Sequence, residues 1–111
     1  MLAKVRYTVG TISDFSDESC HAVALGEGEC LIVRHKGKLH AVGSVCPHQN
    51  APMDDGSLES GQIVCRRHGY RFDLKTGDCR TIGGYGIPVY PVTLEGASVI
   101  VTVYEEQSPT L

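Results

Sequence analysis

The sequence predicts an all-β fold in which small antiparallel sheets form a sandwich or barrel. Two observations favour this fold class. The 111 residues include 13 Gly and 5 Pro, which indicates frequent turns. Short runs of apolar and β-branched residues recur between these turns. The length is typical of one domain, which we expect to cover residues 1–106, with 107–111 as a flexible tail.

The expected strands are short and are separated by turn residues. In chain order they cover residues 4–9, 21–25, 30–34, 39–42, 62–66, 70–74, 89–94 and 98–104. The first alternates, with Val5, Tyr7 and Val9 on one face. The second and third flank a Gly-containing turn at residues 26–28, and residues 36–38 turn the chain into the fourth, so two hairpins are expected here.

The later strands follow the same reasoning. Gly77 can adopt positive φ in the turn at residues 75–78, after the strand expected at 70–74. Pro91 lies inside the run 89–94, which predicts an edge strand or a bulge there. The last two runs form a hairpin around residues 95–96. Helix signals are few: Ser13-Asp14 is expected to cap a short turn before residues 16–18.

Composition excludes several function classes. The net charge is −3 and no basic run exists, so nucleic acid is not an expected partner. No stretch approaches the ~20 apolar residues of a membrane span. Charged residues among the first seven argue against a signal peptide, so we expect a cytoplasmic protein. The five Cys cannot all pair, which favours metal ligands over a disulfide framework.

Two segments carry metal-ligand chemistry. Cys46-Pro47-His48 follows an expected strand, and Cys65-Arg66-Arg67-His68-Gly69 lies between two expected strands. Each segment offers one soft thiolate and one imidazole. The sequence therefore predicts one metal site whose ligands are Cys46, His48, Cys65 and His68.

Together with Tyr70-Arg71-Phe72-Asp73 and Thr76-Gly77, these segments resemble the binding signature of Rieske [2Fe–2S] proteins. The resemblance extends over about residues 4–104. It implies a Rieske-like antiparallel fold with a cluster-binding subdomain of two loops and one [2Fe–2S] cluster per chain. Cys46 and Cys65 would hold the inner iron, and His48 and His68 the outer one. Two neutral imidazoles leave the oxidised cluster without net charge, which raises its potential above that of four-thiolate clusters.

Within the family, the residues of the two loops indicate a low-potential member. High-potential members add a Cys to each loop, whereas this chain has residues 49–51 (Gln-Asn-Ala) and Arg67 at the matching positions. Those members also supply two hydroxyl donors near the cluster, at positions that are Tyr70 and Phe72 here. With fewer hydrogen-bond donors, the reduced cluster is stabilised less. We therefore expect a reduction potential on the order of −150 mV.

The resemblance implies a one-electron carrier, not itself an enzyme, that takes electrons from a flavoprotein reductase and passes them to a terminal oxygenase. We expect a monomer. Two alternatives remain open: the small Rieske subunit of an assimilatory nitrite reductase, and a redox-sensing binding module. A zinc site is a further alternative for the four ligands, although zinc sites more often contain Cys-x-x-Cys pairs.

The other candidate residues have less specific interpretations. Cys20, Cys30 and Cys79 are expected to be small buried hydrophobic residues. His21, His35 and His40 are expected at the surface or with satisfied hydrogen bonds. Arg66, Arg67 and Arg71 form either a solvated rim or a docking surface. By resemblance, residues 83–88 form a third loop that covers the cluster.

Overall fold

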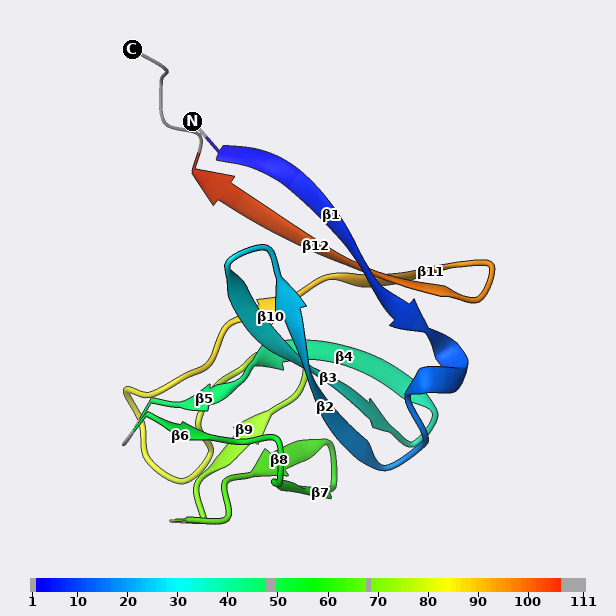
Figure 1. Ribbon diagram of the computed structural model, residues 1–111. Coiled ribbons are helices and arrows are strands. Elements are labelled where there is room, and N and C mark those ends of the chain that lie inside the picture. Colours follow the sequence, from blue (N-terminus) through cyan, green and yellow to red (C-terminus); the bar gives the residue numbers. More distant parts are fainter. Residues whose placement is uncertain (1, 48–49, 68, 107–111) are drawn as a thin grey trace.

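The computed structural model describes residues 2–47, 50–67 and 69–106 and confirms the all-β, antiparallel prediction (Figure 1). The elements, in chain order, are β1 (Leu2–Thr11), the 3₁₀ turn η1 (Ile12–Asp14), β2 (Ser19–Leu25), β3 (Gly28–His35), β4 (Lys38–Gly43), β5 (Val45–Cys46), β6 (Ala51–Pro52), β7 (Ser57–Glu59), β8 (Gln62–Val64), β9 (Arg71–Asp73), β10 (Val89–Tyr90), β11 (Val92–Glu95) and β12 (Ser98–Glu106).

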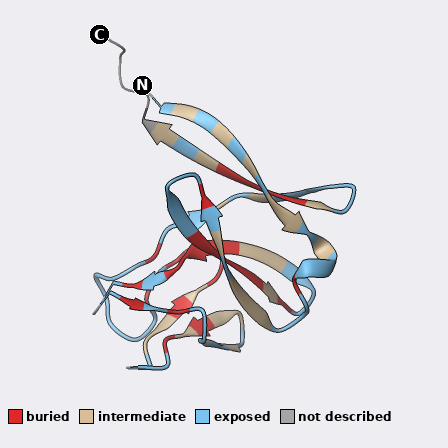
Figure 2. Ribbon diagram, viewed as in Figure 1, coloured by how far each residue is buried: buried red, intermediate tan, exposed pale blue. Residues whose placement is uncertain are grey.

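The main sheets lie in three layers. The central sheet has the order β10-β4-β3-β2, with β1-β12-β11 on one side and β7-β8-β9 on the other (Figure 1). Leu31 and Val33 of β3 pack into one hydrophobic core, and Cys30 and Ile32 pack into the other. Because both faces of β3 are covered, its sequence is a continuous apolar run instead of an alternating one. Figure 2 shows this burial along the central sheet.

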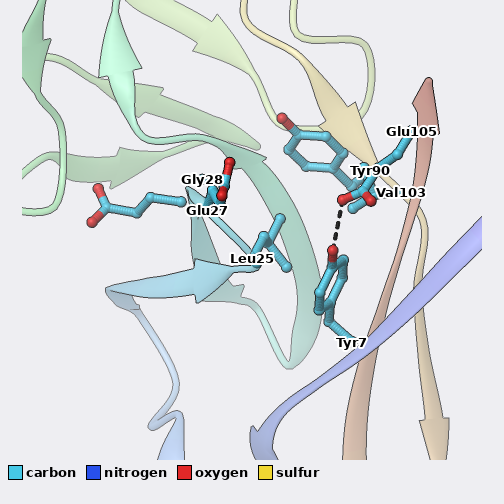
Figure 3. Close-up of a pocket in the computed structure, with 9 residues that line it drawn as sticks. Tyr7, Leu25, Glu27, Gly28, Tyr90, Val103 and Glu105 are labelled. Carbon is cyan, nitrogen blue, oxygen red and sulfur yellow. Dashed lines mark hydrogen bonds between the residues drawn. The ribbon is translucent and has the colours of Figure 1, made fainter. Parts of the chain in front are cut away.

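The long β1–β12 pair forms an arm that extends from the layered body. Its register runs from Leu2↔Glu106 to Thr11↔Ser98. Tyr7 of β1 packs partly against the second core, as the alternation predicted. Between this arm and the β2–β3 turn lies a cavity of about 500 Å³, in which the Tyr7 hydroxyl donates to Glu105 Oε1 at 2.6 Å (Figure 3).

The three predicted hairpins are present as β2–β3, β3–β4 and β11–β12. The run predicted as one strand over 89–94 is two strands, because the chain changes sheets at Pro91. β10 pairs with β4 in the central sheet, whereas β11 pairs with β12 in the outer one. Both are edge strands of their sheets, which agrees with the effect of a proline that cannot donate a ladder hydrogen bond.

Other expectations need correction. The strand expected at 62–66 ends at Val64, before Cys65. The short turn expected before residues 16–18 is η1, but its cap is Thr11 and not Ser13: Asp14 Oδ2 accepts the Thr11 N–H at 2.8 Å, so Asp14 closes a turn that begins at Thr11. The short strands β5, β6 and β7 were not predicted. Within the described residues, no helix is long and apolar enough to cross a membrane. The tail at 107–111 lies outside the described residues.

Candidate metal centre

Cys46 is the last residue of β5 and stands at the start of the first loop. β5 pairs with β6 through Val45↔Pro52 and Cys46↔Ala51, so the chain leaves the sheet after Cys46 and returns directly beside it. The Met53 N–H donates to the Ser44 carbonyl at 2.9 Å and extends this pairing by a further bond. The predicted ligand His48 belongs to this loop but lies outside the described residues.

Cys65 begins the second loop, directly after β8. Its N–H donates to the Tyr70 carbonyl at 2.8 Å, and its own carbonyl accepts the Gly69 N–H at 2.8 Å. Gly69 has φ +71°, a conformation that favours glycine, so the chain can reverse within a few residues. Hydrogen bonds from the backbone N–H of Cys65 and to its backbone carbonyl therefore close the loop at its base. The predicted ligand His68 lies inside it and outside the described residues.

The two cysteines belong to the same hydrophobic core. Both are 0% exposed, and both cluster with Met53 and Phe72. None of the five cysteines is in a disulfide. Two buried, unoxidised thiols on neighbouring loops are the donors that an iron–sulfur cluster requires on its inner side. The described part of the predicted ligand set thus fits a [2Fe–2S] cluster.

A third segment packs beside the second loop. The Cys79 N–H donates to the Tyr85 carbonyl at 3.1 Å, and the Tyr85 and Tyr70 rings meet at a centroid distance of 6.1 Å, tilted by 58°. Ile87 is buried in the core that contains Cys46 and Cys65. The pKa of Tyr70 is raised, first by desolvation and then by the charges of Tyr85, Cys79 and Cys46. Tyr70 and Tyr85 therefore lie near the cysteine side of the site, and Tyr85 belongs to the segment 83–88 that was expected to form a third loop over the cluster.

The remaining cysteines have the environments expected of structural residues. Cys30 is fully buried, Cys79 is 9% exposed, and Cys20 is only half-buried, with its Sγ 3.9 Å from the Gly56 carbonyl oxygen. Burial is the main cause that raises the pKa of Cys20 and of Cys30 to about 11. Both thiols are therefore protonated at neutral pH and are poor ligands or nucleophiles.

The three histidines outside the predicted ligand set differ in their side-chain contacts. His35 is 5% exposed; its Nδ1 lies 2.7 Å from Glu18 Oε1, and its Nε2 accepts the Gly61 N–H at 3.0 Å. His21 Nε2 lies 3.1 Å from Ser19 Oγ. His40 is half-buried. Among the described residues, no other His, Cys, Asp and Glu side chains gather into a metal-binding group.

The three arginines near the second loop differ in their surroundings. Arg66 and Arg67 are exposed beside Cys65. Arg71 Nη2 instead pairs with Glu59 Oε1 of β7 at 3.3 Å. The ion pair with Glu59 could not be predicted from the sequence, because it depends on the register of β7, β8 and β9. Of these three arginines, Arg66 and Arg67 are therefore the two that lie exposed on the second loop itself.

Comparison with known proteins agrees with this geometry. The sequence model of the Rieske [2Fe–2S] domain matches residues 5–91. The chain is 30% identical over 94 residues to the ferredoxin component of the alkene monooxygenase system of Xanthobacter autotrophicus, covering 84% of this chain and 77% of that protein. It is 32% identical over 92 residues to the naphthalene 1,2-dioxygenase ferredoxin component of Pseudomonas putida, covering 81% of this chain and 88% of that protein.

A longer relative and two solved structures complete the comparison. Mouse apoptosis-inducing factor 3 is 38% identical over 80 residues, which are 72% of this chain and only 13% of that protein. The carbazole 1,9a-dioxygenase ferredoxin of Nocardioides aromaticivorans superposes with a TM-score of 0.79 at 25% identity, covering 86% of this chain and 95% of that one. A putative nitrite reductase small subunit of Mycobacterium tuberculosis has a TM-score of 0.84 at 23% identity, covering 91% and 96%. The likeness to the nitrite reductase small subunit shows the shared fold alone.

The family match spans most of the chain, and both buried thiols lie within it. The chain belongs to the Rieske [2Fe–2S] domain family and binds one [2Fe–2S] cluster as an electron-transfer protein.

Proposed function

We propose that Cys46, His48, Cys65 and His68 hold the cluster and that the protein carries single electrons from a flavoprotein reductase to a terminal oxygenase. The observation that carries the proposal is the burial of Cys46 and Cys65 in one core, at the bases of two neighbouring loops. The bound cluster supplies a one-electron couple. The chain contributes the anchoring thiols and keeps them away from water. Relatives that are ferredoxin components of monooxygenase and dioxygenase systems support the oxygenase as the electron acceptor. The flavoprotein reductase is the electron donor that the family resemblance implies.

The surface beside the loops suits a transient partner. Val45, Ile82 and Tyr85 are 40%, 44% and 39% exposed, on segments that adjoin Cys46 or Tyr70. Arg66 and Arg67 are exposed on the second loop. Small mixed surfaces of apolar and charged groups are typical of redox partners that must release one another after each transfer. We further propose a cytoplasmic monomer that is a single domain over residues 1–106.

The ligand assignment is tested by removing single thiols. Cys46→Ala and Cys65→Ala each remove an inner ligand, so we expect loss of the visible absorption and of the electron paramagnetic resonance signal of the dithionite-reduced protein. Cys20→Ala and Cys30→Ala are matched controls, because their thiols lie outside the proposed site, and they should retain about two irons per chain. A colourless wild-type protein with one zinc per chain would overturn the proposal.

The carrier role is tested by electron transfer. A flavoprotein reductase should reduce the protein, and a terminal oxygenase should reoxidise it. Arg66→Ser/Arg67→Ser should change how the transfer rate depends on salt, since removing exposed charges alters steering; Lys4→Ser on the distant arm should not. Co-purification as a tight complex with a sirohaem protein would contradict the carrier and indicate the nitrite reductase subunit.

A further inference from the structure

Three of the four lysines of this chain line one cavity. Lys36, Lys38 and Lys75 surround a space of about 390 Å³ together with His35 and His40. The remaining lining residues are Ser60, Gly61 and Asp73. The chain as a whole has a net charge of −3, so this is a local reversal of sign. A concave surface lined by one sign of charge concentrates counter-ions.

The acidic groups near the cavity are bound by other partners. Asp73 Oδ1 accepts the backbone N–H groups of Lys75 and Thr76 at 2.8 and 3.0 Å, and its Oδ2 pairs with Arg80 at 3.1 Å. Glu18 accepts from the Lys36 backbone N–H at 2.7 Å and contacts His35 at 2.7 Å. Across residues 2–47, 50–67 and 69–106, no ion pair joins a carboxylate to the ammonium group of Lys36, Lys38 or Lys75.

The walls of the cavity are fixed to one another. His35, at the end of β3, accepts the Gly61 N–H at 3.0 Å and so joins the β3–β4 turn to the β7–β8 turn. The Asp73 bonds hold the segment that bears Lys75. The three lysines are therefore carried by backbone whose relative positions are set by buried or multiply bonded groups. The backbone that forms the recess is therefore in place before any ligand binds.

His40 reports the potential inside the recess. It is half-buried, and its pKa is lowered, first by desolvation and then by the charges of His35 and Lys38, with a smaller contribution from Lys75. A hydrogen bond to the Leu74 backbone acts in the opposite direction. Lys38 and Lys75 thus act on the same point from two separate segments. An anion placed there would relieve their mutual repulsion.

We propose that this recess binds a small multivalent oxyanion of the phosphate class, held by the ammonium groups of Lys36, Lys38 and Lys75. Its volume lies within the range of small-molecule sites, about 300–1,000 Å³. Ammonium groups bind phosphate oxygens as point charges and need no planar geometry.

The recess lies at the far end of the strands that lead to the cysteines. β4 begins at Lys38 and runs toward Cys46, β8 begins beside Gly61 and ends before Cys65, and β9 ends at Asp73. The cysteine loops therefore stand at the opposite ends of these strands (Figure 1). A bound anion would leave the proposed electron-transfer surface uncovered. The binding site is independent of the carrier role.

The test is a titration of the cluster-loaded protein with inorganic phosphate near neutral pH, followed by amide nuclear magnetic resonance and calorimetry. Sodium chloride at equal ionic strength corrects for screening. We expect saturable shifts at residues 35–38, 60–61 and 73–75 with phosphate and none with chloride. A phosphate monoester, phenyl phosphate, forms the second arm: tighter binding than inorganic phosphate identifies an organic phosphate as the ligand, and equal or weaker binding identifies the free ion.

The variants make the outcome decisive. Lys38→Ala/Lys75→Ala should weaken phosphate binding at least about tenfold, since each lost ammonium removes a charge-assisted contact. Lys4→Ala removes the fourth lysine, on the exposed arm, and should leave binding unchanged. All these lysines are exposed, so the variants should fold, and unchanged visible spectra would confirm it. Absence of saturable binding, or equal weakening in Lys4→Ala, would overturn the proposal.

Discussion

His35 and His40 lie on the adjacent strands β3 and β4, and their rings have different roles. His35 Nε2 accepts the Gly61 N–H, so the proton of the neutral ring is on Nδ1 and faces Glu18. This ring is a structural link between two turns. The ring of His40 instead lines the lysine-rich recess. Histidine identity alone does not distinguish a ring that links two turns from a ring that lines a cavity.

The lowered pKa of His40 gives stability a pH dependence of known sign. Between that pKa and the usual value of about 6.5, the unfolded chain binds more protons than the folded one. The free energy of unfolding must then fall as pH decreases through this range. Urea unfolding at about pH 7.5 and about pH 5.5 should show a larger loss in wild type than in His40→Asn. An equal loss in both proteins would contradict this origin.

At the residue scale, the sequence was most informative where function depends on local spacing. Cys46 and Cys65 stand beside His48 and His68 in short segments, so the ligand types could be predicted without knowing the fold. The placement of the two histidines remains a prediction. The recess around Lys38 and Lys75 could not be predicted, because the register of three separate turns brings these lysines together.

At the scale of elements, the turn after β9 and the segment before β10 depend on each other. The Gly77 carbonyl accepts the Ile87 N–H at 2.8 Å, and Gly77 has φ +80°. A Cβ at this position would lie 2.0 Å from the Ile87 carbonyl oxygen. This contact ties residues 74–77 to the loop that carries Tyr85, which in turn meets Tyr70 beside the second cysteine loop.

Gly77→Ala should therefore cost more than a loss of glycine flexibility. We expect more than about 2 kcal/mol of destabilisation, because the backbone must shift as well as adopt an unfavourable φ. Gly37→Ala is the matched control: φ is +78° there, but the added Cβ meets nothing within 4 Å, so about 1 kcal/mol is expected. Urea unfolding of the two variants measures the difference. Similar costs would show that the Gly77–Ile87 contact is unimportant.

The longer strands were predictable because each gives enough residues for a periodic or apolar pattern, as in β3. The two- and three-residue strands β5, β6 and β7 give no such pattern, and their pairing is fixed by how the loops return. Pro91 indicated an edge strand correctly. That the chain changes sheets there depends on the packing of the layers, which a local pattern does not contain.

At the scale of the whole molecule, the central sheet has a separate hydrophobic core on each face. One core contains both cysteine thiols, and the other joins the β1–β12–β11 layer to the body. The proposed cluster is therefore held by the part of the molecule formed by β5 to β9 and the adjoining face of the central sheet. This agrees with the expected cluster-binding subdomain of two loops.

The surroundings of the cysteines predict a low reduction potential. Phe72 is fully buried in their core and has no hydrogen-bond donor on its side chain. Because Phe72 supplies no hydrogen bond to stabilise the added electron, we expect a midpoint potential on the order of −150 mV, measured by voltammetry of the intact protein. A value above about +100 mV would place the protein with the high-potential members and contradict this reading.

The arm has a practical consequence for covalent assembly. Because Leu2 pairs with Glu106, strands β1 and β12 bring the two ends of the described chain together at the tip of the arm, away from the cysteine loops (Figure 1). A flexible tether attached at either strand end would leave both loops uncovered. Fusion to a redox partner through this tip would replace a bimolecular encounter with an effective concentration set by linker length. The arm thus makes this fold suitable as a module within longer electron-transfer chains.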